Sequence, residues 1–330
     1  SRSGDSNVAS AIKRVSGVSI QDGKYVFVRG LGDRYIKTIL NGLDIPALDP
    51  DRNTVQLDIF PTSVIDNIVV YKTFTSNLPA DFSGGLVDVS LKSIPEKKIF
   101  QFSISSSFNS ATLNKDFLSI PSGGLDFLGF DDGIRSIPLD NPFASENFNY
   151  SPSTLNLIDP DSFEGLMDLT RAFSTEMSVK KTTPMPNFAL SFLIGDNKKL
   201  NTNKIGYYTA FNYKNNVSFY QNFRQSSLEE NPDSSIYELD LTREQYGNVG
   251  KRNILLSSLS GLTYHSNSNI YKLNILALRN TTHNAGFFYQ RNIESNANYL
   301  KKENIDYSEK SVFNIFINGI HNKSDRLKIK

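Results

Sequence analysis

Charged residues and glycines lie close together in residues 28–35, which read VRGLGDRY. The motif holds Arg29, Gly30, Gly32, Asp33 and Arg34. Glycine permits tight turns and close backbone approach, and arginine forms bidentate contacts with carboxylates. We therefore expect ionic contacts to a surrounding protein wall, as static structural pairs rather than as a lock released during function. The glycines make no dinucleotide-binding fingerprint, because a third glycine and a following helix are not evident.

Other candidate site residues lie in predicted turns of the same region. Asn41 and Gly42 form a dipeptide typical of two-residue hairpins. Residues 81–85 (DFSGG) read as a tight turn before a strand and supply Asp81, Gly84 and Gly85. Asp51 and Arg52 belong to the acidic turn 49–52, and residues 131–133 (DDG) form another. Neither acidic turn has the ligand spacing of a calcium loop, so no metal site is predicted.

The sequence contains few residues that could carry out catalysis. The absence of cysteine excludes a disulfide framework, a thiolate metal site and a cysteine nucleophile. The three histidines, His265, His283 and His321, lie at or near predicted strand ends. No grouping of Ser, His and Asp falls in a motif with a known mechanism. We predict that the chain is not an enzyme and uses no cofactor.

The charge balance and hydropathy narrow the class of protein. Lys and Arg number 35 against 34 Asp and Glu, which argues against nucleic acid as a partner. No stretch approaches the roughly 18 to 20 apolar residues of a transmembrane helix. A soluble protein or a membrane β-barrel remains, and abundant Tyr and Phe favour the barrel.

Residues 1–95 are predicted to form a compact mixed domain. A short helix is expected at residues 7–14. Short β-prone runs separated by Gly, Asp and Pro predict strands at residues 24–29, 36–40, 65–71 and 86–92.

Residues 96–330 follow a different pattern, in which apolar and polar side chains alternate over segments of about ten residues. In the first segment Phe100, Phe102 and Ile104 share one face. Further strands are predicted near residues 188–194, 205–213, 252–264, 271–275 and 311–321, with a seventh beginning before residue 330. Six or seven strands cannot close a membrane barrel, so we expect the chain to be part of a larger barrel.

The connections between these strands alternate in length. Long ones are predicted at about residues 110–186, 214–250 and 281–310, and short ones lie between them. Outer-membrane barrels have short periplasmic turns and long extracellular loops, so the long segments are predicted to be extracellular. The first holds a candidate amphipathic helix at residues 161–174. By position, Phe219, Tyr220 and Phe223 are candidate ligand-facing residues.

The N-terminal region resembles the plug domain of TonB-dependent receptors. The residues that carry the resemblance are 11–18 (AIKRVSGV), 28–35 (VRGLGDRY), 40–44 (LNGLD), 57–61 (LDIFP), 65–73 (IDNIVVYKT) and 79–85 (PADFSGG). The resemblance implies a mixed α/β plug inside a 22-stranded antiparallel barrel of the bacterial outer membrane. Residues 124–138 are similar to the first extracellular loop of a subset of these receptors, and the Asn-, Lys- and Ser-rich barrel suggests a Bacteroidota organism.

The resemblance also implies a function and partners. It implies energy-coupled uptake of a siderophore, cobalamin, haem, oligosaccharide or peptide, with the TonB complex and outer-membrane lipids as partners. No convincing TonB box is found in the sequence. The alternative is a receptor-like scaffold subunit that binds lipoprotein or surface-protein partners. A soluble β-rich enzyme is disfavoured by the alternating loop lengths.

Overall fold

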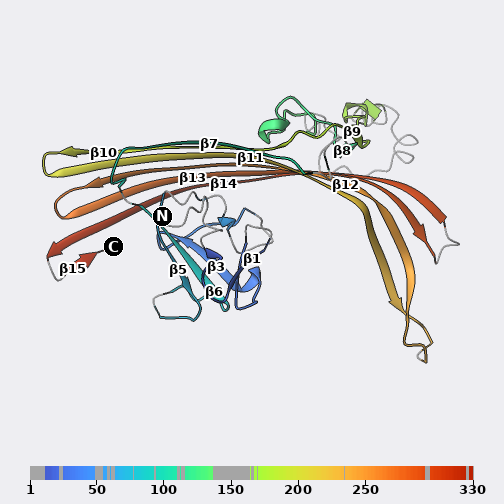
Figure 1. Ribbon diagram of the computed structural model, residues 1–330, viewed down its shortest axis with the longest axis horizontal. Helices are drawn as coiled ribbons and strands as arrows, with labels where there is room; N and C mark the ends of the chain where they lie inside the picture. The colour runs from blue at the N-terminus through green and yellow to red at the C-terminus, as the bar shows by residue number, and fades with distance from the viewer. Residues whose placement is uncertain are drawn as a thin grey trace.

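The structure is a computed structural model. It describes residues 12–21, 25–48, 55–57, 60, 64–76, 78–92, 94–109, 112, 116–136, 164, 167–168, 170–233, 235–293, 298–324 and 327–329. A small N-terminal domain lies on one side of a long curved sheet, and a smaller group of elements lies on the other side (Figure 1). Among the described residues, no helix is long and apolar enough to cross a membrane.

The N-terminal domain contains a hairpin and a four-stranded sheet. The hairpin is β1 (Val18–Gln21) and β2 (Tyr25–Val28), and the sheet order is β4-β3-β6-β5. Its strands are β3 (Ile36–Leu40), β4 (Leu43–Asp44), β5 (Ile65–Tyr71) and β6 (Gly85–Leu91), of which β3 and β6 are parallel. The strands predicted at 36–40 and 65–71 are confirmed, and those at 24–29 and 86–92 agree with β2 and β6 to within one residue. The predicted helix 7–14 lies mostly outside the described residues, although Ile12 is helical.

Alternation along these strands builds one apolar core. Val87, Val89 and Leu91 of β6 are buried, whereas Asp88 and Ser90 between them are only partly buried. The same core takes in buried residues of the neighbouring strands and loops, among them Val26, Val28, Ile36, Leu40, Val55, Leu57 and Phe60. Burial of these side chains, at about 1.5–3 kcal/mol each, gives the domain its stability.

The large sheet has seven antiparallel strands in the order β15-β14-β13-β12-β11-β10-β7. They are β7 (Ile99–Ser107), β10 (Asn187–Leu200), β11 (Asn203–Glu230), β12 (Leu239–His265), β13 (Asn269–Asn292), β14 (Asn298–Ser324) and β15 (Leu327–Ile329). Apart from β7 and β10, which the first long connection separates, neighbouring strands follow each other in sequence. Short turns join β10 to β11 and β12 to β13 at the end that we call the turn end. All six predicted strands and the beginning of a seventh are present.

The predicted conformation of the second and third long connections is wrong. Residues 214–230 and 239–250 are strand and pair as the extensions of β11 and β12, with register shifts after Tyr220 and after Ser227. Residues 281–292 and 298–310 likewise extend β13 and β14 as one hairpin. These extensions are held by backbone hydrogen bonds between their strands. Their buried apolar residues, such as Val217, Phe219 and Ala285, do not alternate regularly with polar ones over the whole segment, so the pattern used to predict strands is incomplete there.

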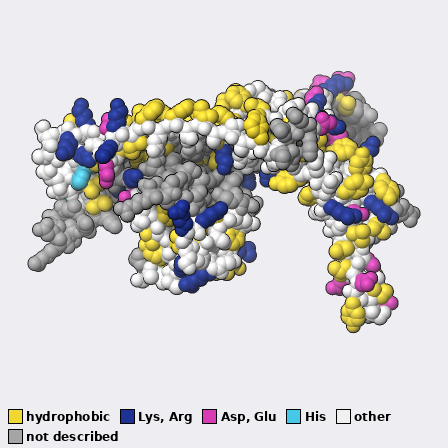
Figure 2. All heavy atoms as spheres, in the orientation of Figure 1, with side chains coloured by type: hydrophobic (Ala, Val, Ile, Leu, Met, Phe, Trp, Pro, Cys, Tyr) yellow, Lys and Arg dark blue, Asp and Glu magenta, His cyan; other side chains and the backbone are white. Residues whose placement is uncertain are grey.

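The two faces of the large sheet differ. One row of paired residues, Leu193, Ala210, Leu259 and Leu276, is buried against the core of the N-terminal domain. This is the concave face. On the opposite, convex face Phe102, Phe313 and Ile317 are 57%, 69% and 77% exposed. Figure 2 shows hydrophobic side chains gathered along this convex surface.

The first long connection folds onto the convex face. It contains β8 (Phe117–Ser119), the 3-10 helix η4 (Asp126–Leu128) and β9 (Lys180–Thr182), which pairs with β8. Phe117, Leu118 and Ile120 form a second apolar cluster with Val217 and Phe219 of β11. Of the predicted helix 161–174, residues 164, 167–168 and 170–172 are described and helical.

Candidate functional site

Residues 28–35 form a tight turn and one turn of 3-10 helix, η1 (Asp33–Tyr35). Arg29 and Gly30 occupy the turn with φ of 53° and 76°, and the Leu31 amide donates to the Val28 carbonyl at 3.0 Å. The turn thus reverses the chain directly after β2. Arg29 lies exposed at its corner.

Gly84 and Gly85 pack directly against this turn, so two separate motifs form one structural unit. The Gly84 amide donates to the Tyr35 carbonyl at 2.7 Å. A Cβ on Gly84 would lie 3.0 Å from Tyr35 Cβ, and one on Gly85 would lie 3.0 Å from Val28 Cβ. Both contacts are tighter than ordinary van der Waals contact. A side chain at either position would therefore need its neighbours to shift.

An ion-pair cluster joins the β3–β4 hairpin to the loop before β6. Lys37 Nζ lies 2.7 Å from Asp44 Oδ2 and also contacts Asp81 Oδ2. Burial works to lower the pKa of Lys37, but its hydrogen bonds and charge pairing with the two aspartates raise it above the ordinary value. The hydrogen bond from Lys37 in turn lowers the pKa of Asp81.

The Asn41-Gly42 turn is the predicted two-residue hairpin. Leu40 pairs with Leu43, and the turn residues have φ of 54° and 80°. Asn41 also ties the turn to β6, since its Oδ1 accepts a 2.8 Å hydrogen bond from the Leu91 amide. Asp51, Arg52 and the side chain of Asp33 lie outside the described residues. The expected ionic contacts of Arg29, Asp33 and Arg34 with barrel carboxylates stay a prediction.

A cavity of about 550 Å³ lies between the N-terminal domain and the concave face of the large sheet. Tyr25, Leu48 and Gln56 line it from the domain. Four strands line it from the sheet, with Asn216, Ser218, Tyr220, Lys251, Asn253, Asn280, Thr282, Asp306, Ser308 and Lys310. Because side chains alternate along a strand, every second residue of each strand faces this space.

The lining is rich in hydrogen-bonding groups. Gln56 is only 4% exposed, and its Nε2 donates to the Tyr25 hydroxyl at 3.0 Å. Its Oε1, and the Oδ1 of Asn280, are buried acceptors that have no hydrogen-bond partner among the described residues. A buried polar atom left unpaired costs free energy, so these acceptors favour a ligand that donates hydrogen bonds. Lys251 and Asp306 add opposite charges to the wall.

Of the three aromatic candidates, the structure brings only Tyr220 to the cavity. Phe219 faces the convex side, where it is buried with its ring centroid 6.1 Å from that of Phe117. Phe223 follows a register shift in β11 and packs 6.0 Å from Phe288, away from the cavity lining. The polar lining residues of β12, β13 and β14 were not predicted, because the segments that contain them were expected to be loops. Polar residues at every second position, such as Asn280 and Thr282, were the available signal.

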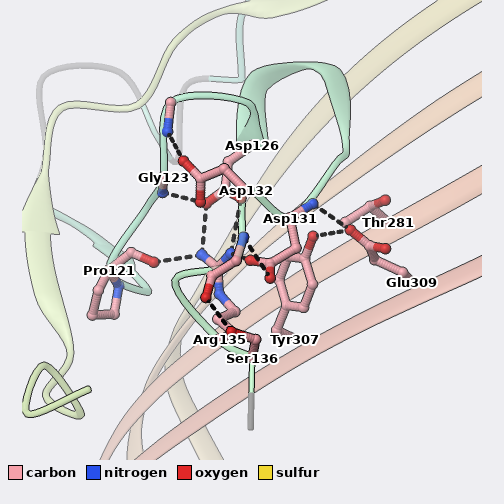
Figure 3. Close-up of polar contacts among 12 residues, drawn as sticks. Pro121, Gly123, Asp126, Asp131, Asp132, Arg135, Ser136, Thr281, Tyr307 and Glu309 are labelled. Carbon is pink, nitrogen blue, oxygen red and sulfur yellow. Dashed lines mark hydrogen bonds and ion pairs between the residues drawn. The ribbon is translucent and has the colours of Figure 1, made fainter. Parts of the chain in front are cut away.

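A second polar site holds the first long connection against the convex face (Figure 3). Arg135 makes a bidentate ion pair with Asp126, at 2.9 Å from Nη1 to Oδ1 and 2.6 Å from Nη2 to Oδ2. It also pairs with Asp131 at 2.7 Å and stacks over the ring of Tyr307 at 4.1 Å. The Asp131 amide donates to Glu309 Oε1 at 2.6 Å.

Backbone and side chains of the large sheet complete this attachment. Arg279 Nε and Thr281 Oγ1 both donate to the Gly129 carbonyl, at 2.6 and 2.7 Å. The predicted acidic turn 131–133 is thus an anchored turn. Among the described residues, no group of three or more His, Cys, Asp or Glu side chains could hold a metal ion.

Comparison with known proteins gives a family match for the N-terminal domain. Residues 1–86 match the family model of the TonB-dependent Receptor Plug Domain. Among solved structures the chain is similar to the "Copper transporter OprC", with 10% sequence identity, a TM-score of 0.25, and coverage of 98% of this chain and 60% of that one. The chain thus spans 60% of the length of that structure. No curated protein matches the chain.

A mixed domain seated against one face of a large antiparallel sheet is the arrangement of a plugged β-barrel receptor. Over residues 1–86 the N-terminal domain matches the plug domain of TonB-dependent receptors. The large sheet is barrel wall, with the plug on its concave side.

Proposed function

We propose that this receptor is a TonB-dependent transporter of the outer membrane that takes up a polar, hydrogen-bonding ligand through the cavity between plug and wall. The observation that carries the proposal is the shared lining of that cavity, to which the plug contributes Gln56 and Tyr25 and the wall contributes Asn280 and Thr282. A ligand held by both parts is released when the plug moves. The TonB complex is the partner that would move it.

The surface chemistry of the sheet supports the membrane location. Its convex face is apolar where the strands leave the turn end, and its concave face is polar beyond the plug core. Outer-membrane barrels alternate in this way, with lipid outside and a polar lumen inside. The short turns between β10 and β11 and between β12 and β13 would face the periplasm.

The lining favours one part of the range of possible substrates. Unpaired acceptors on Gln56 and Asn280 fit ligand hydroxyl or amide donors, and Lys251 fits ligand acceptors. An oligosaccharide or a peptide offers both kinds of group. A largely apolar ligand such as haem would leave these buried atoms unpaired.

The test combines binding and uptake. Gln56→Leu and Asn280→Leu each remove hydrogen bonds of about 0.5–1.5 kcal/mol, which predicts a rise in Kd of about 2- to 13-fold. Gln225→Leu is the matched control, since Gln225 is exposed and bonds Gln245 on the distant hairpin. Uptake of labelled oligosaccharides and peptides is measured in cells with and without TonB. Uptake that is unchanged by both cavity variants and by loss of TonB would contradict the proposal.

A second candidate function is the scaffold role, in which the receptor binds lipoprotein or surface-protein partners. It is favoured by apolar side chains on the hairpin tips, where Tyr237 is 97% exposed, Tyr299 70% and Leu300 49%. Exposed aromatic residues at projecting sites are common at protein interfaces. Stoichiometric co-purification that is lost in Tyr237→Ser, with normal uptake, would support this role.

A further inference from the structure

The convex face carries an apolar band whose limits can be placed. On β12 the band is bounded by Tyr264 and Leu256, and between them Leu262, Ser260 and Ser258 also face the convex side. Eight residue steps at ~3.4 Å span about 27 Å along the strand, and a tilt of about 40° reduces this to roughly 20 Å across the bilayer. Nine residues is the length expected for a membrane-spanning β-strand, about 9–11 residues.

A charged residue marks the end of this band away from the turn end. Arg279 pairs across the strands with Leu256 and so lies on the convex face in the last row of the band. An arginine on the lipid face costs about 2–4 kcal/mol at the midplane and roughly 0–1 near the interface. Arg279 bonds the Gly129 carbonyl and Glu309, and its guanidinium lies 4.1 Å from the ring centre of Phe130. The apolar surface of the band therefore ends at this row, where Arg279 is covered by contacts with Gly129, Phe130 and Glu309.

The folded loop, which we define as residues 117–136, is attached at this row. The Tyr213 hydroxyl, in the same row as Leu256, donates to the Phe127 carbonyl at 2.6 Å. Four large apolar side chains of the loop stay exposed although the loop is fixed by the ion pairs of Arg135. They are Leu125 at 46%, Phe127 at 52%, Phe130 at 40% and Ile134 at 40%.

The exposed side chains continue the apolar band. Phe127 and Phe130 lie directly over its last row, through the contacts to Tyr213 and Arg279. Contiguous exposed apolar surface marks an interaction site. Aromatic side chains at the level of the headgroups are typical of membrane–water interfaces. A lipid surface is the occupant that such continuity favours.

We propose that the folded loop rests on the outer leaflet and buries Leu125, Phe127, Phe130 and Ile134 at the boundary between headgroups and acyl chains. This inference rests on the proposed function, because it needs the convex face to be in lipid. The loop then works as an anchor on the outside of the barrel wall. It fixes the depth of the strands in the bilayer.

Single cysteines provide the test, since the chain has none of its own. Phe127→Cys and Leu125→Cys are labelled with an environment-sensitive fluorophore in the full chain. Phe102→Cys in the band and Tyr237→Cys at a hairpin tip are the matched controls. The proteins are reconstituted in phosphatidylcholine vesicles that carry nitroxide quenchers at the headgroup or deep in the acyl chain.

The label at Phe127 is expected to lose most of its emission to the headgroup quencher and little to the deep quencher. The label at Phe102 is expected to respond most to the deep quencher, and the label at Tyr237 to neither. If labels at both Phe127 and Leu125 behave like the one at Tyr237, the inference is wrong. Shielding from aqueous iodide without lipid quenching would show a protein partner and would also overturn it. Absence of quenching at Phe102 would instead refute the membrane location in the proposed function.

Discussion

Loss of the Arg135 side chain should release the folded loop from the barrel wall. Asp126 is nearly inaccessible, with its side chain 2% exposed, and Arg135 is 20% exposed. Arg135→Met keeps much of the side-chain volume but leaves the Asp126 carboxylate with the Gly123 amide, at 3.0 Å, as its remaining described donor. Removal of one partner of a buried ion pair costs about 3–5 kcal/mol.

We expect the lower end of that range, because Arg135 is partly exposed and the Gly123 contact remains. A loss of about 3 kcal/mol corresponds to an increase on the order of 100-fold in the population of the detached loop. The reporters are the amides of Leu128, Gly129 and Asp131, which donate to Leu125, Asp126 and Glu309 respectively. Their hydrogen exchange in detergent or vesicles should accelerate by about that factor, since local opening limits it.

Two further variants separate the ion pair from a general loss of charge. Arg135→Lys keeps the charge but loses the bidentate geometry, and should give an intermediate acceleration. Arg171→Met removes an exposed pair with Asp168, whose side chains are 73% and 69% exposed, and should leave the three amides unchanged. If exchange in Arg135→Met equals that of the wild type, the ion pair does not hold the loop on the wall.

Two predictions concern the plug. Gly42 has φ of 80°, a left-handed conformation that disfavours any side chain. Gly42→Ala should therefore destabilise the β3–β4 turn by about 1–2 kcal/mol, measured as faster hydrogen exchange of the β3 amides. Unchanged exchange would contradict the turn geometry. The hydrogen bond from Lys37 lowers the pKa of Asp81, so the pair stabilises the plug above the unfolded-state pKa and loses this effect as the pH falls through the lowered folded-state value. Asp81 is 61% exposed, so the pair contributes roughly 0.2–1 kcal/mol. Asp81→Asn should therefore lower plug stability slightly at pH 7 but not below about pH 2, as measured by denaturant titration at both pH values. An equal loss of plug stability at both pH values would show that the charge of Asp81 is not the cause.

The sequence was sufficient for the parts of the fold that depend on local patterning. Short strands such as β3 and β5 have turn residues at both ends, and their apolar residues face one core. The strands that cross the apolar band alternate because one face is exposed and the other packs on the plug. Pattern and burial agree there, so prediction succeeded.

The parts that prediction missed depend on partners distant in sequence. Asp131 and Glu309 lie 178 residues apart and meet because the first connection folds back over β14. The cavity likewise joins Gln56 of the plug to Asn280 of the wall. The spacing of residues within one segment cannot predict a contact between residues so far apart in the sequence. The extensions of β11 to β14 were missed for a different reason, since apolar and polar residues alternate irregularly along them while backbone pairing holds the strands together.

Because side chains alternate along β13, this strand contributes to the loop attachment on the convex face and to the cavity on the concave face. Arg279 and Thr281 hold the folded loop on the convex face, whereas Asn280 and Thr282 line the cavity on the concave face. A strand positions these four side chains with one backbone segment, so a substitution at one position changes one surface while the backbone pairing of the other is kept. This separation is the reason that cavity variants test ligand binding and loop variants test attachment. It also means that a backbone shift in β13 would reach the cavity and the folded loop together.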